Sequence, residues 1–117
     1  MNDTHDSVIR SHRMKGDVLI VELEGDIDLQ HSLAFQKQIS SLIDRAARGL
    51  VFDLTDVPYM DSSGVASLVK VLSSCRKQEM EMALAGLNPR VRGIFEITRL
   101  DKVFRMYDTV EKALQEL

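Results

Sequence analysis

The run Asp61-Ser62-Ser63-Gly64 holds the residue types in this sequence that are best suited to chemistry. Serine and aspartate are preferred at helix starts, because their side-chain oxygens accept hydrogen bonds from the unpaired N–H groups of the first turn. That turn also carries the positive end of the helix dipole, so it can hold an anion such as a phosphate. A serine hydroxyl placed there would be exposed and able to carry a phosphoryl group without disrupting its own fold.

The residues on either side predict the elements that would hold this turn. Residues 50–54, Leu-Val-Phe-Asp-Leu, have the length and the β-branched and aromatic content of a buried strand. After the turn, Val65, Leu68, Val69 and Leu72 recur at helical spacing and predict one apolar stripe of an amphipathic helix. The serines are therefore expected at a junction between a strand and a helix.

The N-terminal part of the chain predicts a hairpin and then a helix. Residues 7–14 and 17–24 are the two expected strands, and Gly16 between them suits a turn that requires a positive φ. Asp28 or Ser32 is expected to cap the helix that follows. Its predicted inner face is Phe35, Ile39, Leu42 and Ala46, and Gly49 is the expected C-cap.

The C-terminal part continues the alternation of strands and helices. A strand is expected at residues 80–85, a helix that starts at Asn88-Pro89, a strand at 103–107 and a helix capped by Asp108 or Thr109. Strands that alternate with helices favour right-handed crossovers and parallel pairing. The predicted fold class is α/β: one domain with a mixed, mainly parallel sheet of about 4–5 strands, helices packed against it, and an antiparallel hairpin at its start. The predicted inner face of the third helix is Val91, Ile94, Phe95 and Thr98.

Composition narrows the classes of function. The 117 residues are 44% hydrophobic and 28% charged, as in an ordinary globular domain, and residues 1–117 are expected to form one domain with its core at about 8–117. A net charge of −3 without a long basic run gives no electrostatic case for nucleic acid or an anionic membrane. The single cysteine, Cys75, excludes an internal disulfide, and neither a signal peptide nor a membrane span is recognisable. A cytoplasmic, soluble protein is expected.

Catalysis by the serine turn is one alternative. Ser62 and Asp61 with His5, His12 or His31 would supply the residue types of a hydrolase triad. The turn lacks the Gly-x-Ser-x-Gly elbow, however, and no glycine-rich oxyanion loop occurs elsewhere in the sequence. The histidines are scattered along the chain, so the sequence favours a protein that is not an enzyme.

Metal and nucleotide sites have no support in the residue spacing. No Cys/His pair has ligand spacing, and the chain lacks the Gly-x-x-x-x-Gly-Lys loop that holds nucleotide phosphates. No cofactor and no metal are therefore expected. The carboxylates that lack the spacing of a calcium loop are Asp26, Asp28, Asp53, Asp56 and Asp61.

Four segments together resemble the STAS-domain family, specifically the bacterial anti-sigma factor antagonists. They are residues 21–28 (Val-Glu-Leu-Glu-Gly-Asp-Ile-Asp), the strand at 50–54 with Val57, the run 60–64 (Met-Asp-Ser-Ser-Gly), and residues 84–91 (Leu-Ala-Gly-Leu-Asn-Pro-Arg-Val). They occur in the order typical of the family, and the resemblance extends from about Val8 to Leu117.

The resemblance implies a role for particular residues. In such proteins the serine after the aspartate, here Ser62, is phosphorylated by a partner that is both an ATP-dependent serine kinase and an anti-sigma factor. The unphosphorylated form binds that partner and frees the sigma factor, and a PP2C-type phosphatase resets the serine. The partner-binding residues expected by this resemblance are Asp28, Asp61, Ser62, Ser63 and Gly64, and a monomer is expected.

Charge offers a physical account of such a switch. Phosphorylation adds about −1.5 to −2 charge at pH 7, and an unpaired charge buried in an interface costs several kcal/mol. The phosphate is expected to abolish partner binding without a large rearrangement, while the helix N-terminus accommodates it. The alternative within the same family is a STAS subunit of a membrane transport complex, such as the cytoplasmic partner of a lipid-exporting ABC transporter.

Overall fold

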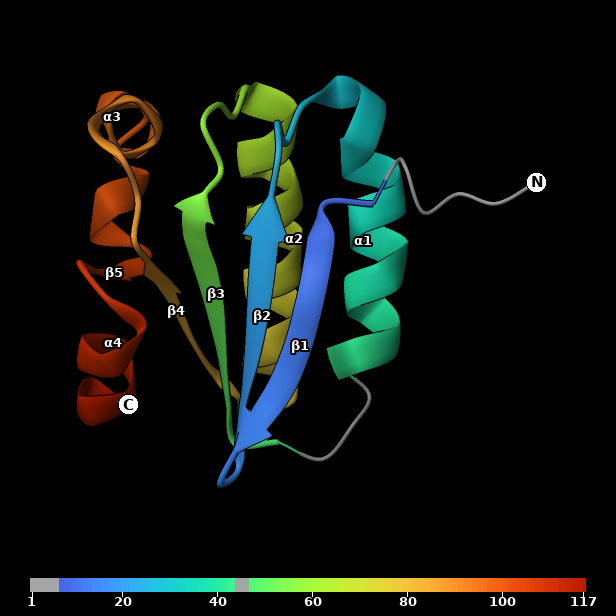
Figure 1. Cartoon of the computed structure of the whole chain (residues 1–117), viewed down its shortest axis with the longest axis vertical. Helices are drawn as coiled ribbons and strands as arrows, with labels where there is room; N and C mark the ends of the chain where they lie inside the picture. Colours follow the sequence, from blue (N-terminus) through green and yellow to red (C-terminus); the bar gives the residue numbers. More distant parts are fainter. Residues whose placement is uncertain (1–6, 44–46) are drawn as a thin grey trace.

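The computed structural model describes residues 7–43 and 47–117, which form a five-stranded sheet flanked by helices (Figure 1). The strands lie side by side in chain order, β1-β2-β3-β4-β5. The first two pair antiparallel, and every later pair is parallel. The strands are β1 (Ile9–Lys15), β2 (Val18–Glu24), β3 (Gly49–Asp56), β4 (Glu81–Ala85) and β5 (Arg105–Tyr107); the helices are α1 (Leu29–Ile43), α2 (Ser62–Lys77), α3 (Pro89–Ile97) and α4 (Val110–Glu116), with a 3-10 turn at Leu100–Lys102.

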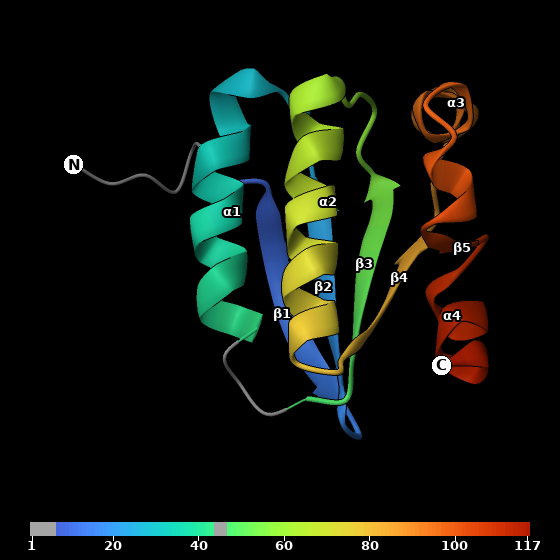
Figure 2. The same cartoon turned by 180° about the vertical axis from the view of Figure 1, so that it is seen from behind.

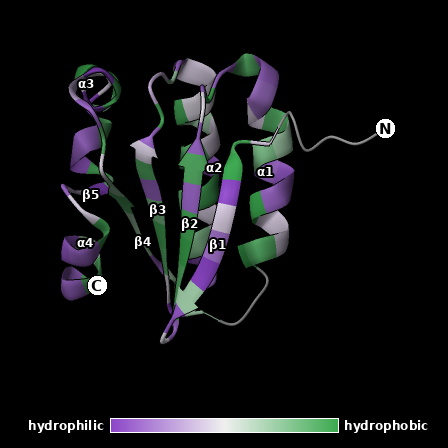
Figure 3. Cartoon of the chain, viewed as in Figure 1, coloured by the Kyte–Doolittle hydropathy of each residue, from purple (hydrophilic) through white to green (hydrophobic). Residues whose placement is uncertain are grey.

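The helices divide between the two faces of the sheet. Figures 1 and 2 show α1 and α2 side by side across one face of β1, β2 and β3. The larger core lies beneath these two helices, where the rings of Phe35 and Phe52 are 5.7 Å apart. On the other face Ala83 and Ala85 leave room for Ala113 of α4. Figure 3 shows hydrophobic residues gathered on the central strands, whereas the edge strand β1 is mostly hydrophilic.

The predicted order of elements and the mixed sheet are confirmed. Gly16 has a φ of +62°, as the predicted hairpin turn requires. Asn88 caps α3, because its side-chain oxygen accepts a 2.8 Å hydrogen bond from Val91 N, and Pro89 occupies the first turn. Thr109, one of the two expected residues, caps α4.

Several predicted details are wrong, each for a packing reason. Val69 is 39% exposed, because the buried face of α2 is centred on Leu68 and Val71 and Val69 lies past its edge. Gly49 is the first residue of β3 and not a C-cap. Thr98, expected on the inner face of α3, is exposed at its end.

The last predicted strand, at residues 103–107, is also shorter than expected. A 3-10 turn precedes it, so β5 begins only at Arg105. Phe104 is buried against Phe95, with the ring centroids 5.3 Å apart, which ties this connection to α3. Ala46, expected on the inner face of α1, lies outside the described residues.

Candidate functional site

Ser62 is the first residue of α2 and is exposed to solvent. The helix starts here because Asp61 adopts extended backbone angles and its side chain closes the first turn. Asp61 Oδ1 accepts hydrogen bonds from Ser63 N at 2.8 Å and from Gly64 N at 3.1 Å. The Ser62 hydroxyl is thus carried on a helix start that is fixed by its neighbour, as the sequence predicted.

The same carboxylate also reaches a second helix. Asp61 Oδ2 accepts a 3.3 Å hydrogen bond from the backbone N–H of Leu29, the first residue of α1. One aspartate therefore caps α2 and holds the start of α1. Asp61 already accepts hydrogen bonds from two of the first-turn N–H groups that were expected to hold a phosphate. A phosphate on Ser62 would therefore be stabilised by the positive end of the helix dipole but would also lie beside the Asp61 carboxylate.

The loop between β2 and α1 lies against the serine turn. Ile27 pairs with Met60 in an isolated parallel bridge, and Asp61 N donates to Ile27 O at 3.3 Å. A Cβ on Gly64 would lie 2.3 Å from Ile27 O and 2.6 Å from Met60 Cγ, so only glycine fits at this crossing. The two segments thus form one packed unit.

Asp28 is the N-cap of α1 and pairs with a histidine one turn along. Its Oδ1 accepts from His31 N at 3.2 Å and lies 2.6 Å from His31 Nδ1. Partial desolvation raises the pKa of Asp28, but the hydrogen bonds and the charge of His31 outweigh it and hold that pKa below its ordinary value. Sequence reasoning treated His31 as an isolated surface residue; the i, i+3 spacing from a cap aspartate is the signal that could have revealed the pair.

The predicted site residues come together, but they do different things. Ser63 is partly buried and its backbone holds the turn: its N–H binds Asp61 and its carbonyl accepts from the Ser67 hydroxyl at 3.0 Å. Gly64 is buried, so it can affect a partner only through the shape of the turn. The fully buried Ser67 also accepts from Gln36 of α1 at 2.9 Å, a link between the helices that residue spacing does not reveal.

An apolar groove begins at Ser62 and runs between α2 and α3. It encloses about 450 Å³, and the exposed side of Val69 forms part of its wall. Lys70 is the only charged residue among those that line it. The lining residues are Ser62, Val65, Ala66, Val69, Lys70, Ile94, Thr98 and Leu100.

The structure does not assemble a triad or a metal centre from the residues that it describes. His31 is engaged by Asp28, and His12 lies within β1, opposite Val21. His5 falls outside the described residues. Within residues 7–43 and 47–117, no three His, Cys, Asp or Glu side chains come close enough together to hold a metal ion.

Fold and site together define a small mixed α/β domain that presents a capped serine beside an apolar groove. The model of the STAS domain matches residues 11–113, and the chain belongs to this family. The anti-sigma F factor antagonist of Paenibacillus polymyxa is 32% identical over 101 residues, which are 86% of each chain.

Solved structures agree with the family assignment. The crystal structure of an anti-sigma factor antagonist from Mycobacterium paratuberculosis has a TM-score of 0.86 and 27% identity, and covers 95% of this chain and 94% of its own. SpoIIAA, a Bacillus cell fate determinant, has the same fold at TM-scores of 0.77 unphosphorylated and 0.69 phosphorylated, with 21% and 20% identity. These two structures cover 91% of this chain and 93% and 96% of their own.

Family membership settles one prediction. The anti-sigma factor antagonists of this family are non-enzymatic regulators, which confirms that the chain is not an enzyme. Among the helices that the structure describes, none has the length and apolar content needed to cross a bilayer.

Proposed function

We propose that this protein is an anti-sigma factor antagonist that works by partner switching. Unphosphorylated, it binds a serine kinase that is also an anti-sigma factor and so frees the sigma factor; phosphorylation of Ser62 ends the binding. One observation supports this most directly: Ser62 is exposed on a helix start that Asp61 holds rigidly. Such a hydroxyl is accessible to a kinase and to a PP2C-type phosphatase that would reset it.

The phosphoryl transfer itself explains why the partner would leave. For the reaction, Ser62 Oγ must lie about 3–3.5 Å from the γ-phosphorus of ATP in the kinase. The new Oγ–P bond forms as the bond to the β,γ-bridging oxygen breaks, ADP is the leaving group, and the hydroxyl proton passes to a base of the kinase. The phosphoserine then faces both ADP and the carboxylate of Asp61, which lies next to it in the chain. Repulsion between the phosphoserine and ADP favours release directly. The repulsion between the phosphoserine and Asp61 is stronger in the complex, where the partner excludes the water that screens it, and so it also favours release.

The magnitude is sufficient for a switch. Each 1.4 kcal/mol changes affinity tenfold, and burying an unpaired charge in an interface costs several kcal/mol. A loss of at least a hundredfold is therefore expected from the phosphate alone. The protein should keep its fold when Ser62 is phosphorylated, because Asp61 rather than Ser62 makes the capping hydrogen bonds of α2.

The surface that the partner covers includes the groove beside Ser62. Val65, Val69 and Ile94 line it, and their apolar side chains would supply affinity that is independent of the serine. We further propose that the protein acts in the cytoplasm as a monomer and that residues 1–117 form one STAS domain.

The test uses the kinase-type anti-sigma factor encoded nearest to this gene. Incubation with that kinase and ATP should add one phosphate, at Ser62, as shown by mass spectrometry, and Ser62→Ala should remain unmodified. Ser62→Asp should weaken binding in calorimetry by tenfold or more. The matched control is Ser73→Asp, which adds the same charge to an exposed serine about 16 Å further along α2 and should bind normally.

Two results would contradict the proposal. One is the absence of phosphate on Ser62 after incubation with an active kinase. The other is equal affinity of the wild type and Ser62→Asp, which would remove the charge argument. A transporter protein recovered as the stable partner instead would favour the STAS subunit of a transport complex.

A further inference from the structure

The side chains of two leucines on α1 are exposed and take no part in the hydrophobic core. Leu29 is 75% exposed and Leu33 is 64% exposed, and they lie one helical turn apart on the same side of the helix. The core is made by other residues of α1, so the amphipathic pattern of the helix does not require leucine at either position. The residues of α1 that face the core or lie buried are Ser32, Phe35, Ile39, Leu42 and Ile43.

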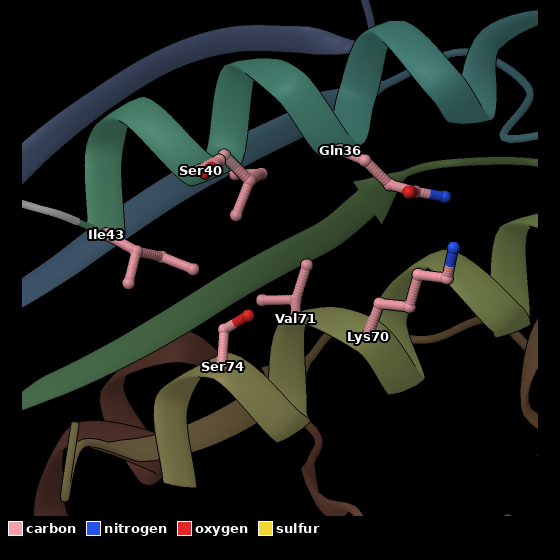
Figure 4. A pocket seen from close by; sticks show the side chains of 7 residues that line it. Gln36, Ser40, Ile43, Lys70, Val71 and Ser74 are labelled. Carbon is pink, nitrogen blue, oxygen red and sulfur yellow. The ribbon is translucent and has the colours of Figure 1, made fainter. Parts of the chain in front are cut away.

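The two leucines occupy only the half of α1 that lies near Ser62. The same edge of the helix continues through Gln36 and Ser40, which are polar. Figure 4 shows these two residues at the seam with α2, where the Lys70 side chain extends toward Gln36. Along this edge of α1, large exposed apolar side chains are therefore confined to the end beside the serine turn.

The exposed face of α2 also changes from apolar near Ser62 to polar further along the helix. Ala66 and Val69, which follow Ser62 at helical spacing, are exposed and apolar, whereas Ser73, one turn further, is exposed and polar. On both helices exposed apolar side chains are thus gathered at the end that carries the serine. Solubility alone does not account for such a distribution, and exposed apolar surface next to a functional residue marks an interaction site.

The geometry of the turn makes the leucines continuous with Ser62. Leu29 N lies 3.3 Å from Asp61 Oδ2, and Leu33 lies about 6 Å further along α1. A standard protein interface covers about 800 Å² on each partner, which is a disc of about 16 Å radius. An interface of this size that is centred on the Ser62 hydroxyl is wide enough to reach both leucines.

We infer that Leu29 and Leu33 form a second apolar contact for the kinase partner, across the serine from the groove between α2 and α3. This inference rests on the proposed function. The occupant is an apolar surface of that kinase, and Ser62 lies between the two contacts. The leucines supply affinity and orient the hydroxyl, while the charge of Ser62 decides whether the complex forms.

The test replaces both leucines by glutamine, which keeps side-chain length and helix propensity but removes the apolar surface. Affinity is measured for the kinase with ADP bound. The double variant is expected to bind at least tenfold more weakly than the wild type, because each replacement removes most of the apolar contact that the leucine side chain makes with the kinase. Met14→Gln is the matched control: Met14 is 47% exposed on β1, near the end of the sheet away from Ser62, and should bind like the wild type. Urea unfolding of each variant checks that the fold is intact.

The outcomes separate this inference from the proposed function. If the double variant binds normally while Ser62→Asp does not, the leucine contact is refuted and the switch stands. If the wild type does not bind the kinase at all, both are refuted. If the wild type sediments as a dimer that the double variant abolishes, a second copy covers the leucines and the inference is overturned.

Discussion

Asp61 is the residue whose replacement tests the architecture of the site most sharply. Its two carboxylate oxygens do separate work: Oδ1 closes the first turn of α2, and Oδ2 holds the first residue of α1. Asp61→Ala removes both functions and the charge at the helix start. Asp61→Asn keeps one carbonyl oxygen for the α2 cap, but its NH2 group cannot accept from Leu29 N.

The expected costs follow from these contacts. Loss of an N-cap costs about 1 kcal/mol, loss of the charge at the helix N-terminus about 0.3–1 kcal/mol, and loss of one further hydrogen bond about 0.5–1.5 kcal/mol. Asp61→Ala should therefore lower the free energy of unfolding by about 2–3 kcal/mol. Asp61→Asn should cost about 1 kcal/mol less, since it keeps the cap.

Urea unfolding at pH 7 measures both variants, and thermal unfolding should show a decrease in Tm of about 4 °C for each kcal/mol. The control is Asp26→Ala, which removes the same charge from an exposed residue of the adjacent loop and should change stability by less than about 0.5 kcal/mol. A cost below about 0.5 kcal/mol for Asp61→Asn, which loses the contact with Leu29 N but keeps the cap, would refute the bridge to α1. Equal costs for Asp61→Ala and Asp61→Asn would refute the cap of α2. A cost below about 0.5 kcal/mol for Asp61→Ala would refute both.

Three further predictions concern buried or paired groups. Gly64→Ala should destabilise the fold by about 2–3 kcal/mol in urea unfolding, because its Cβ would lie 2.3 Å from Ile27 O; a neutral effect would show that this crossing is loose. Burial raises the pKa of the Cys75 thiol to about 11, so a thiol reagent at pH 8 should react with it slowly in the native protein and rapidly in urea; fast native labelling would contradict its burial. The pKa of Asp28 is held below its unfolded value of 3.8, so its ionised form stabilises the fold above that pH and the benefit is lost as pH falls through the lower, folded value. The stability difference between the wild type and Asp28→Asn should accordingly shrink between pH 5 and pH 3 in urea unfolding, and a constant difference would refute the pairing with His31.

Much of the fold could be predicted from the sequence because its signals are local. Gly16 at a positive φ and the Asn88-Pro89 helix start are fixed by the conformations that these residue types favour. The position of Ser62 was predictable for the same reason: an apolar strand, an aspartate and an amphipathic helix follow one another directly in the chain.

What the sequence did not reveal depends on contacts between distant segments. Helical spacing places Val69 within the core stripe, but the residue is exposed and only the position of α3 shows that it lines a groove. The reach of Asp61 to Leu29 spans 32 positions and depends on how the β2–α1 loop packs on the turn. Gly49 suits a C-cap by residue type, yet it pairs within β3 with Val18 and Glu81.

The order of the strands in the sheet has a consequence for folding during synthesis on the ribosome. Each strand is hydrogen-bonded to the one translated just before it, so no segment has to wait for a distant part of the protein before it can pair. Pairing between consecutive strands limits each loop closure to one crossover, which keeps its entropy cost below that of pairing between distant strands. The serine turn, which needs only β2, β3 and the first two helices, can be complete while the last forty residues are still being synthesised, so a nascent chain on the ribosome could already expose the surface that its partner recognises.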